Sequence, residues 1–239
     1  MTDIRVENDP VRTQVRVECD LGSLFGDARD QGDRPTCLAF AASDAHAALR
    51  AGWEPLSCEY AFYQAQRRSN RPPKVGALLP DMLDALRDDG QPQEKGWPYL
   101  DATPPDGADW SPPEDVGEIY RRLGTVRPES VDEILQSLDA GKPIMVLMTL
   151  SRSFYSPPES GIIRPQPDEQ PILSLRHAVV AIGYGVVDGE RAILVRNSWG
   201  EDWGLGGCAW LAETFLTPRL MRLAALTEEI NGPDARQAA

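Results

Sequence analysis

The sequence predicts an α+β protein of two lobes, with helices concentrated in the first half of the chain and strands in the second. Three helical patterns with caps or glycine stops lie before residue 91, and short apolar runs separated by turns follow residue 142. The chain has 239 residues and a hydrophobic composition of 41%. This length allows one sizeable core, or two half-domains that share one interface.

The first half contains, in order, a strand at residues 11–19 and helices at residues 37–49, 58–68 and 79–90. Alternation of apolar and polar residues predicts the strand. Thr36 and Ser57 are suitable N-caps for the first two helices, and Gly90 ends the third. Residues 91–115 are rich in proline and glycine but contain three aromatic residues, so we expect an ordered loop that buries these rings.

The second half contains, in order, a short helix at residues 130–141, strands at residues 142–150, 177–185, 191–199 and 206–214, and a polar tail at residues 227–239. A turn at Asp188 and Gly189 joins the second and third of these strands as an antiparallel hairpin. A proline-rich loop, residues 151–171, precedes this hairpin. We therefore assign about residues 24–112 to a helical lobe, and about residues 10–23 and 113–226 to a β-rich lobe.

The formal net charge is −13, from 37 acidic and 24 basic residues. This balance disfavours nucleic acid and anionic membranes as partners, because both are bound through clustered Lys and Arg. The first residues lack the basic and apolar regions of a signal peptide, and no apolar run is long enough to span a membrane. The four cysteines lack metal-binding spacing, so we expect no metal or cofactor, and reduced thiols in the cytoplasm.

Cys37 stands in the first turn of its predicted helix, where unpaired N–H groups and the helix dipole favour an anion. We expect a thiol pKa below the usual value of about 8.5 and a nucleophilic thiolate; a buried structural cysteine is the alternative. Of the two histidines, His46 lies on the same helix and cannot reach Cys37, which leaves His177 as the proton partner. Asn197 can orient the ring of His177, and Gln31 can aim its amide at a developing oxyanion.

The predicted hairpin carries both His177 and Asn197, so its register matters. A two-residue turn with regular pairing would place His177 opposite Gly200, beyond Asn197. Direct pairing of His177 with Asn197 requires a loop centred near Val187, or a bulge. We predict one of these two irregularities.

These segments resemble the motifs of the papain-like cysteine peptidases. QGDRPTCLAF resembles the family's QGxCGSCWAF block, HAVVAIGYG its histidine block, and VRNSWGEDWGLGG its Asn-Ser-Trp-Gly block. About 140 residues separate the cysteine from the histidine, as in this family. The resemblance implies a papain-like fold with a helical left lobe, an antiparallel β-barrel-like right lobe, and the active-site cleft between them.

The resemblance also implies a role for each residue of the site. Cys37 is the nucleophile, His177 the general base and acid, Asn197 the group that orients His177, and Gln31 an oxyanion donor. Trp199 would shield the His–Asn hydrogen bond from water. The substrate-binding residues carried over from the family are Pro35, Gly76, Ala77, Arg176 and Ala178.

The chain also departs from the family pattern. Arg34 stands where many members have a cysteine, so their disulfide at this position is absent. Pro35 replaces a common glycine and stiffens the wall of the S1 pocket. Arg176 either reaches the S2 pocket, where it would accept an acidic P2 residue, or points to solvent. We expect no long inhibitory pro-segment within residues 1–36, so either the enzyme is restrained by another route or the sequence was trimmed. We expect narrow specificity or control by a regulatory protein partner, and a bacterial member of the family.

The leading functional hypothesis is a cysteine endopeptidase that acts on protein or peptide substrates through an acyl-enzyme at Cys37. A second hypothesis keeps this triad for acyl transfer of the transglutaminase or deamidase type. A third is a catalytically silent module that retains the cleft for binding. The presence of Cys37, His177, Asn197 and Gln31 together disfavours the third hypothesis.

Overall fold

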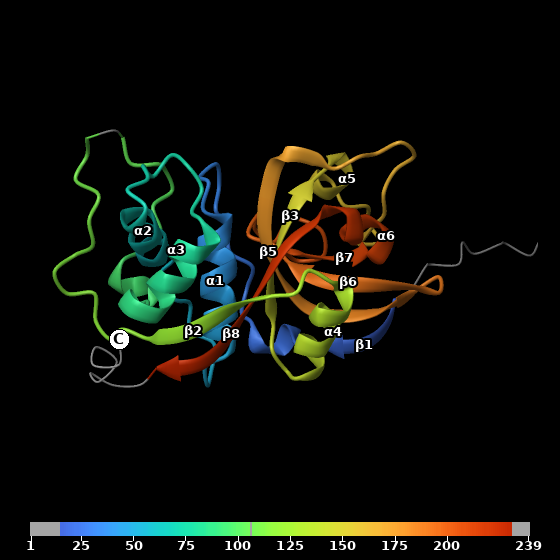
Figure 1. The fold of residues 1–239 in the computed structure, drawn as a ribbon, viewed down its shortest axis with the longest axis horizontal. Helices are drawn as coiled ribbons and strands as arrows, with labels where there is room; N and C mark the ends of the chain where they lie inside the picture. The colour runs from blue at the N-terminus through green and yellow to red at the C-terminus, as the bar shows by residue number, and fades with distance from the viewer. Residues whose placement is uncertain (1–14, 106, 231–239) are drawn as a thin grey trace, which may run out of the picture.

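The computed structural model describes residues 15–105 and 107–230, which fold into two lobes side by side (Figure 1). The left lobe in this view holds the long helices, and the right lobe holds most of the sheet. The predicted α+β class is confirmed by this segregation. Residues 11–14 of the first predicted strand lie outside the described residues, and the strand itself is β1, Arg16–Asp20.

The left lobe contains the three predicted helices. They are α1 (Cys37–Ala48), α2 (Cys58–Arg68) and α3 (Leu79–Asp84), the last continued by a π-helical turn at Ala85–Asp89. Every residue of α1 after Cys37 is buried, including the polar residues Ser43, Asp44 and His46, so the helix is enclosed on all sides. Ser57 caps α2 by accepting a hydrogen bond from the N–H of Tyr60. Thr36 occupies the predicted N-cap position of α1, but its hydroxyl makes no capping hydrogen bond and pairs with that of Tyr99 instead.

The right lobe is built on an eight-stranded sheet with the order β2-β8-β3-β5-β6-β7-β4, in which β1 also pairs with β5. The strands after β1 are β2 (Arg121–Arg127), β3 (Ile144–Leu150), β4 (Ile162–Ile163), β5 (Ile172–Val187), β6 (Glu190–Arg196), β7 (Cys208–Ala212) and β8 (Leu220–Ile230). Short helices α4 (Val131–Asp139), α5 (Arg152–Tyr155) and α6 (Glu213–Leu216) lie between them. The sheet is open, since β2 and β4 end it without pairing with each other, so the barrel-like closure that we expected is wrong.

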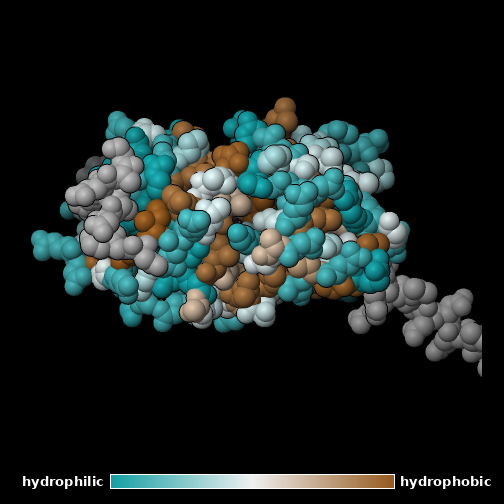
Figure 2. Space-filling view, turned by 60° about the horizontal axis from the view of Figure 1, so that its bottom comes forward, coloured by the Kyte–Doolittle hydropathy of each residue, from teal (hydrophilic) through white to brown (hydrophobic). Residues whose placement is uncertain are grey.

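Strand β8 also corrects the predicted tail. Residues 227–230 belong to β8, and Ile230 and Glu229 pair with Arg121 and Arg122 of β2. These paired ends pass under the helical lobe (Figure 1). On this underside, hydrophobic residues gather in the middle and hydrophilic residues surround them (Figure 2). The two lobes are therefore joined by strands as well as by side-chain packing.

The two faces of the sheet bury different clusters of side chains. Ala178, Val180 and Ile182 of β5 pack with the helices of the left lobe. The alternate residues, Val179 and Ala181, pack on the opposite face with the cluster that includes α4 and α6. This is the period of two that a strand buried on both faces requires. Helix α1, which begins with Cys37, therefore lies directly against β5, the strand that contains His177.

The hairpin of β5 and β6 contains both a tight turn and a bulge. Val187 pairs with Glu190, and Asp188 and Gly189 between them have φ of 52° and 80°, as a type I′ turn requires. The pairing shifts between Ala181 and Gly183, which confirms the predicted irregularity as a bulge.

Candidate active site

Cys37 is the first residue of α1, and its sulfur faces β5 of the other lobe. The backbone N–H groups of Ala178 and Leu38 lie close enough to the sulfur to favour its thiolate form. The N–H of Ala178 belongs to the residue directly after His177, so the fold brings the predicted nucleophile to the strand of the predicted base. The two residues come from different lobes and are far apart in sequence.

The electrostatics of Cys37 differ from our expectation. Burial raises the pKa of the Cys37 thiol, and the hydrogen bonds from the backbone of Ala178, Leu38 and Cys37 itself only oppose this shift. The prediction that the helix N-terminus alone lowers the pKa is wrong, because desolvation of a lone thiolate outweighs the stabilisation by these N–H groups. A thiolate at this position therefore needs a positive charge beside it.

His177 is buried, and its Nε2 lies 2.6 Å from Oδ1 of Asn197. The same Oδ1 accepts a hydrogen bond of 2.8 Å from the N–H of Ser198. Because an amide oxygen can only accept, Nε2 of His177 carries the proton in this pair, and Nδ1 of the neutral ring keeps its lone pair. Burial lowers the pKa of His177 to about 4, and the hydrogen bond with Asn197 opposes this shift.

Aromatic rings cover the imidazole of His177. The ring centroid of Trp199 lies 4.8 Å from that of His177, and the ring of Phe154 lies at 5.7 Å. Tyr155 stacks on Trp199 with 5.4 Å between the centroids and an interplanar angle of 22°. The contact of Trp199 with His177 agrees with the predicted shielding role. Phe154 and Tyr155 were missed by the sequence analysis, although the SRSFY segment at the start of the proline-rich loop contains them.

Gln31 is buried beside the same segment of chain. Its backbone N–H donates to the carbonyl of Ser198 over 2.9 Å, and its Oε1 accepts from Oγ of Ser198 over 2.7 Å. Its Nε2 donates to the carbonyl of Arg34 over 2.7 Å. One of the two N–H bonds of this amide remains for another acceptor. The connection through Ser198 ties the predicted oxyanion donor to the residue after Asn197.

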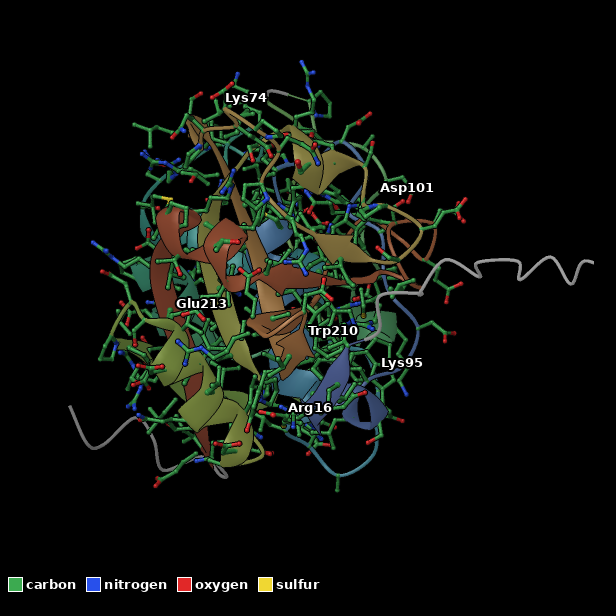
Figure 3. All side chains as sticks on the ribbon, turned by 90° about the vertical axis from the view of Figure 1, so that its right-hand side faces the viewer. Arg16, Lys74, Lys95, Asp101, Trp210 and Glu213 are labelled. Carbon is green, nitrogen blue, oxygen red and sulfur yellow. The ribbon has the colours of Figure 1, made fainter. Side chains whose placement is uncertain are left out.

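The predicted substrate-binding residues occupy different environments. Gly76 faces the carbonyl of Pro35, since a Cβ at Gly76 would lie 3.6 Å from that oxygen. Lys74, from the same loop, lies at the upper edge of the molecule (Figure 3). Ala77 packs partly buried against the left-lobe core, and Ala178 is buried beside Cys37. Arg176 is exposed, which agrees with the solvent-facing alternative.

A buried charge cluster next to the site was missed by the sequence analysis. Asp44 of α1 accepts hydrogen bonds from Arg29 at 2.5 Å and from Arg196 at 2.7 Å. Arg29 lies two residues before Gln31, and Arg196 directly precedes Asn197. The single acidic residue inside an alanine-rich helix was the available signal. Asp44 therefore joins the helix of Cys37 to the two segments that carry the other predicted site residues.

His46 is fully buried on α1 and lies outside this group of residues. Its Nδ1 is 3.1 Å from Oε1 of Gln91, and burial lowers its pKa to about 3. Within residues 15–105 and 107–230, no group of three His, Cys, Asp or Glu side chains is arranged to hold a metal ion. In the same residues, no helix is long and apolar enough to cross a membrane, and all four cysteines are free.

The proline-rich loop forms a groove on the right lobe. The groove has a volume of about 1360 Å³ and is lined by α5, by the loop itself, by Ile172 at the start of β5, and by Asp188 at the hairpin turn. Tyr155 connects this groove to Trp199.

Comparisons with known proteins bear on the family and on the fold. The model of the papain family cysteine proteases matches residues 56–215, which include His177 and Asn197 but begin after Cys37. The chain is 25% identical over 196 residues to a cysteine protease of Blomia tropicalis, covering 77% of this chain and 56% of that protein. It is 27% identical over 187 residues to cysteine proteinase 1 of Entamoeba histolytica, covering 75% and 57%, respectively. The matched chain thus spans little more than half the length of these relatives.

Among solved structures, xylellain, a cysteine protease from Xylella fastidiosa, superposes with a TM-score of 0.75 and 21% identity. The superposition covers 95% of this chain and 94% of that one. This likeness confirms the papain-like fold. With a family model that matches more than half of its residues, the chain belongs to the papain family of cysteine proteases.

Proposed function

We propose that the chain is a cysteine endopeptidase that hydrolyses peptide bonds through an acyl-enzyme at Cys37. The observation that supports this proposal is the proximity of Cys37 of the left lobe to the strand of His177 in the right lobe, together with the contact between His177 and Asn197. The Cys37 sulfur lies against the N–H that follows His177, and Nε2 of His177 is 2.6 Å from Asn197. The tautomer set by Asn197 leaves Nδ1 as the base for the Cys37 proton.

The chemical steps follow from these positions. Nδ1 of His177 takes the thiol proton while the sulfur of Cys37 forms a bond with the scissile carbonyl carbon, and the π electrons move to the carbonyl oxygen. The free N–H of the Gln31 amide and the backbone N–H of Cys37 are suited to stabilise this oxygen. His177 then gives its proton to the leaving amine as the C–N bond breaks. Water, activated by His177, hydrolyses the thioester and restores the thiol.

The pKa shifts of Cys37 and His177 support proton transfer between these two residues. Burial favours the neutral form of each group when the other is neutral. Proton transfer from Cys37 to His177 creates opposite charges side by side, which offsets the desolvation of both ions. The reactive thiolate is therefore a property of the pair and not of the helix terminus alone.

The experiment that tests this function is digestion of a peptide library by the wild-type chain and by Cys37→Ala, with the products read by mass spectrometry. We expect new peptide termini with the wild type only. Release of ammonia without new termini would overturn hydrolysis in favour of the deamidase-type alternative. Failure of Cys37 to react selectively with iodoacetamide at neutral pH would favour a binding module. The comparisons favour neither alternative, since the relatives described above are named as proteases.

We also propose a narrow specificity or control by a protein partner, and a reducing compartment such as the cytoplasm, which agrees with four free cysteines. Broad digestion of an unrelated unfolded protein would contradict the first of these proposals. For the S2 pocket, Arg176→Ala is the informative variant, compared with wild type on substrates with Glu and Leu at P2. If the ratio of kcat/KM for the Glu substrate to kcat/KM for the Leu substrate is the same in Arg176→Ala as in wild type, Arg176 has no role in the choice of the P2 residue.

A further inference from the structure

The turn of residues 31–36 connects the predicted oxyanion donor to the nucleophile. Gln31 begins this turn, and Thr36 precedes Cys37. The carbonyl of Arg34 accepts hydrogen bonds from Nε2 of Gln31, at 2.7 Å, and from the N–H of Thr36, at 2.8 Å. The orientation of the Gln31 amide therefore depends on where the peptide of Arg34 is held.

The side chain of Arg34 is held by a buried ion pair. Arg34 is 2% exposed and Glu59 of α2 is fully buried. Nη1 of Arg34 lies 2.5 Å from Oε2 of Glu59, and Nη2 lies 2.9 Å from Oε1, which is a bidentate geometry. Nη1 also donates to the carbonyl of Leu100, at 2.7 Å.

Glu59 is saturated by further donors. Nε1 of Trp110 donates to its Oε1 over 2.7 Å, and the N–H of Leu100 donates to its Oε2 over 3.2 Å. Each carboxylate oxygen thus accepts from two groups. A buried carboxylate with this many partners has little freedom to move, so it is a fixed anchor for Arg34.

Tyr99 holds the same turn from a second side. Its ring lies under the guanidinium of Arg34, with 4.7 Å from Cζ to the centroid. Its hydroxyl donates to the carbonyl of Gln31 over 2.8 Å and pairs with Oγ1 of Thr36 over 2.7 Å. Since the Tyr99 proton goes to Gln31, Thr36 is the donor to Tyr99. The two ends of the turn are therefore bridged by one hydroxyl.

We propose that Arg34 and Glu59 are positioning residues for the oxyanion hole: their buried ion pair fixes the Arg34 carbonyl, which orients the amide of Gln31 toward the reacting carbonyl. Neither residue touches the substrate in this proposal, and both act through Gln31. Arg34 occupies the position at which the sequence lacks the family's cysteine. The turn is thus held by charge and hydrogen bonds, without a redox-sensitive bond. This inference rests on the proposed peptidase function.

The test compares Glu59→Gln and Arg34→Lys with wild type, and measures kcat, KM and the rate of Cys37 alkylation by iodoacetamide. Alkylation requires the thiolate but forms no oxyanion. We expect kcat to fall about 10- to 100-fold, with KM and the alkylation rate nearly unchanged. In a Gln31→Ala background, we expect Glu59→Gln to cause no further loss, because its effect passes through Gln31.

Arg122→Met is the matched control, since Arg122 is also a buried arginine, paired with Glu229 of β8 at 3.0 Å, and it does not contact the 31–36 turn. A general loss of stability would affect this control and the test variants alike. The proposal is overturned if Glu59→Gln lowers alkylation as much as kcat, or if its loss multiplies with that of Gln31→Ala. If Glu59→Gln does not fold, Tyr99→Phe removes only the bridging hydroxyl, and we expect the same selective loss of kcat on a smaller scale.

A peptide aldehyde separates this proposal from the proposed function. The Cys37 sulfur adds to the aldehyde carbon, and the thiol proton ends on the former carbonyl oxygen, so the adduct needs no hydrolysis. We expect Glu59→Gln to weaken aldehyde binding about 10-fold relative to wild type and to Arg122→Met. If wild type binds the aldehyde but cleaves no peptide, the proposed function fails and this comparison still decides the role of Glu59. Equal aldehyde affinity of Glu59→Gln and wild type would overturn the positioning role.

Discussion

The Nε2 atom of His177 lies 2.6 Å from Oδ1 of Asn197, although the two residues are not directly opposite in the hairpin. The bulge between Ala181 and Gly183 brings Val180 opposite Arg196, where the pairing ends. Continued in this register, Asn197 would face Val179, two residues from His177. Both side chains then lie on one face of the sheet as diagonal neighbours, within reach of a hydrogen bond. The bulge therefore permits the contact without exact pairing of the two residues.

Asn197→Ala should lower kcat about 10- to 100-fold and leave KM nearly unchanged. The reason is that His177 loses the acceptor that holds its proton on Nε2 and its ring in place. Steady-state kinetics on a peptide substrate measure both constants, and a thermal melt checks the fold. A rise of KM with constant kcat would contradict the orienting role of Asn197.

His177→Ala should slow the alkylation of Cys37 at pH 7 at least about 10-fold and move its pH midpoint above 8.5. Burial raises the pKa of the Cys37 thiol, and this variant removes the cation that would stabilise the thiolate. The measurement is the rate of iodoacetamide labelling between pH 5 and pH 10. A profile that matches wild type would show that the helix terminus alone supports the thiolate.

Both histidines should make the folded protein less stable in acid. Burial lowers the pKa of His177 to about 4 and that of His46 to about 3, from an ordinary 6.5. Below pH 6.5 the unfolded chain therefore binds more protons than the folded protein, so the free energy of unfolding falls as the pH falls. Between pH 7.5 and pH 5 the expected loss is about 2 kcal/mol for each histidine.

Urea unfolding at the two pH values measures this loss, and His46→Gln provides the control, because the difference between the two pH values should shrink by about half. The His46→Gln variant keeps His177 and the site. An unchanged pH difference in this variant would contradict the assignment of the lowered pKa to buried His46.

Asp44→Asn should destabilise the fold by about 3–5 kcal/mol. The substitution removes the carboxylate that both the buried Arg196 and the partly buried Arg29 contact. The matched control is Asp89→Asn, which breaks pairs with the more exposed Arg67 and Arg68 and should cost at most about 1 kcal/mol. Denaturant titrations of both variants measure the difference, and equal losses would exclude a special role of the Asp44 cluster.

The sequence by itself determined the elements whose signals are local. Helical periodicity and a good cap placed α2, and an Asp-Gly pair placed the β5–β6 turn. The motifs around Cys37, His177 and Asn197 identified the family and predicted the site, because these residue types occur together for one kind of chemistry. The spacing in the hairpin predicted an irregularity, either a longer loop or a bulge, and the structure has the bulge, although His177 and Asn197 are not paired directly.

Only the tertiary structure decided the features that depend on distant partners. The openness of the sheet is set by which strands pair at its edges, and β8 extends through residues 227–230 because β2 lies beside it. The pKa shifts of Cys37 and His177 depend on burial by both lobes. The charge pairs of Asp44 and of Arg34 with Glu59 join segments that are separate in the sequence. Burial, strand pairing and desolvation depend on which residues surround a given residue in space. Local sequence patterns do not show which distant residues these are.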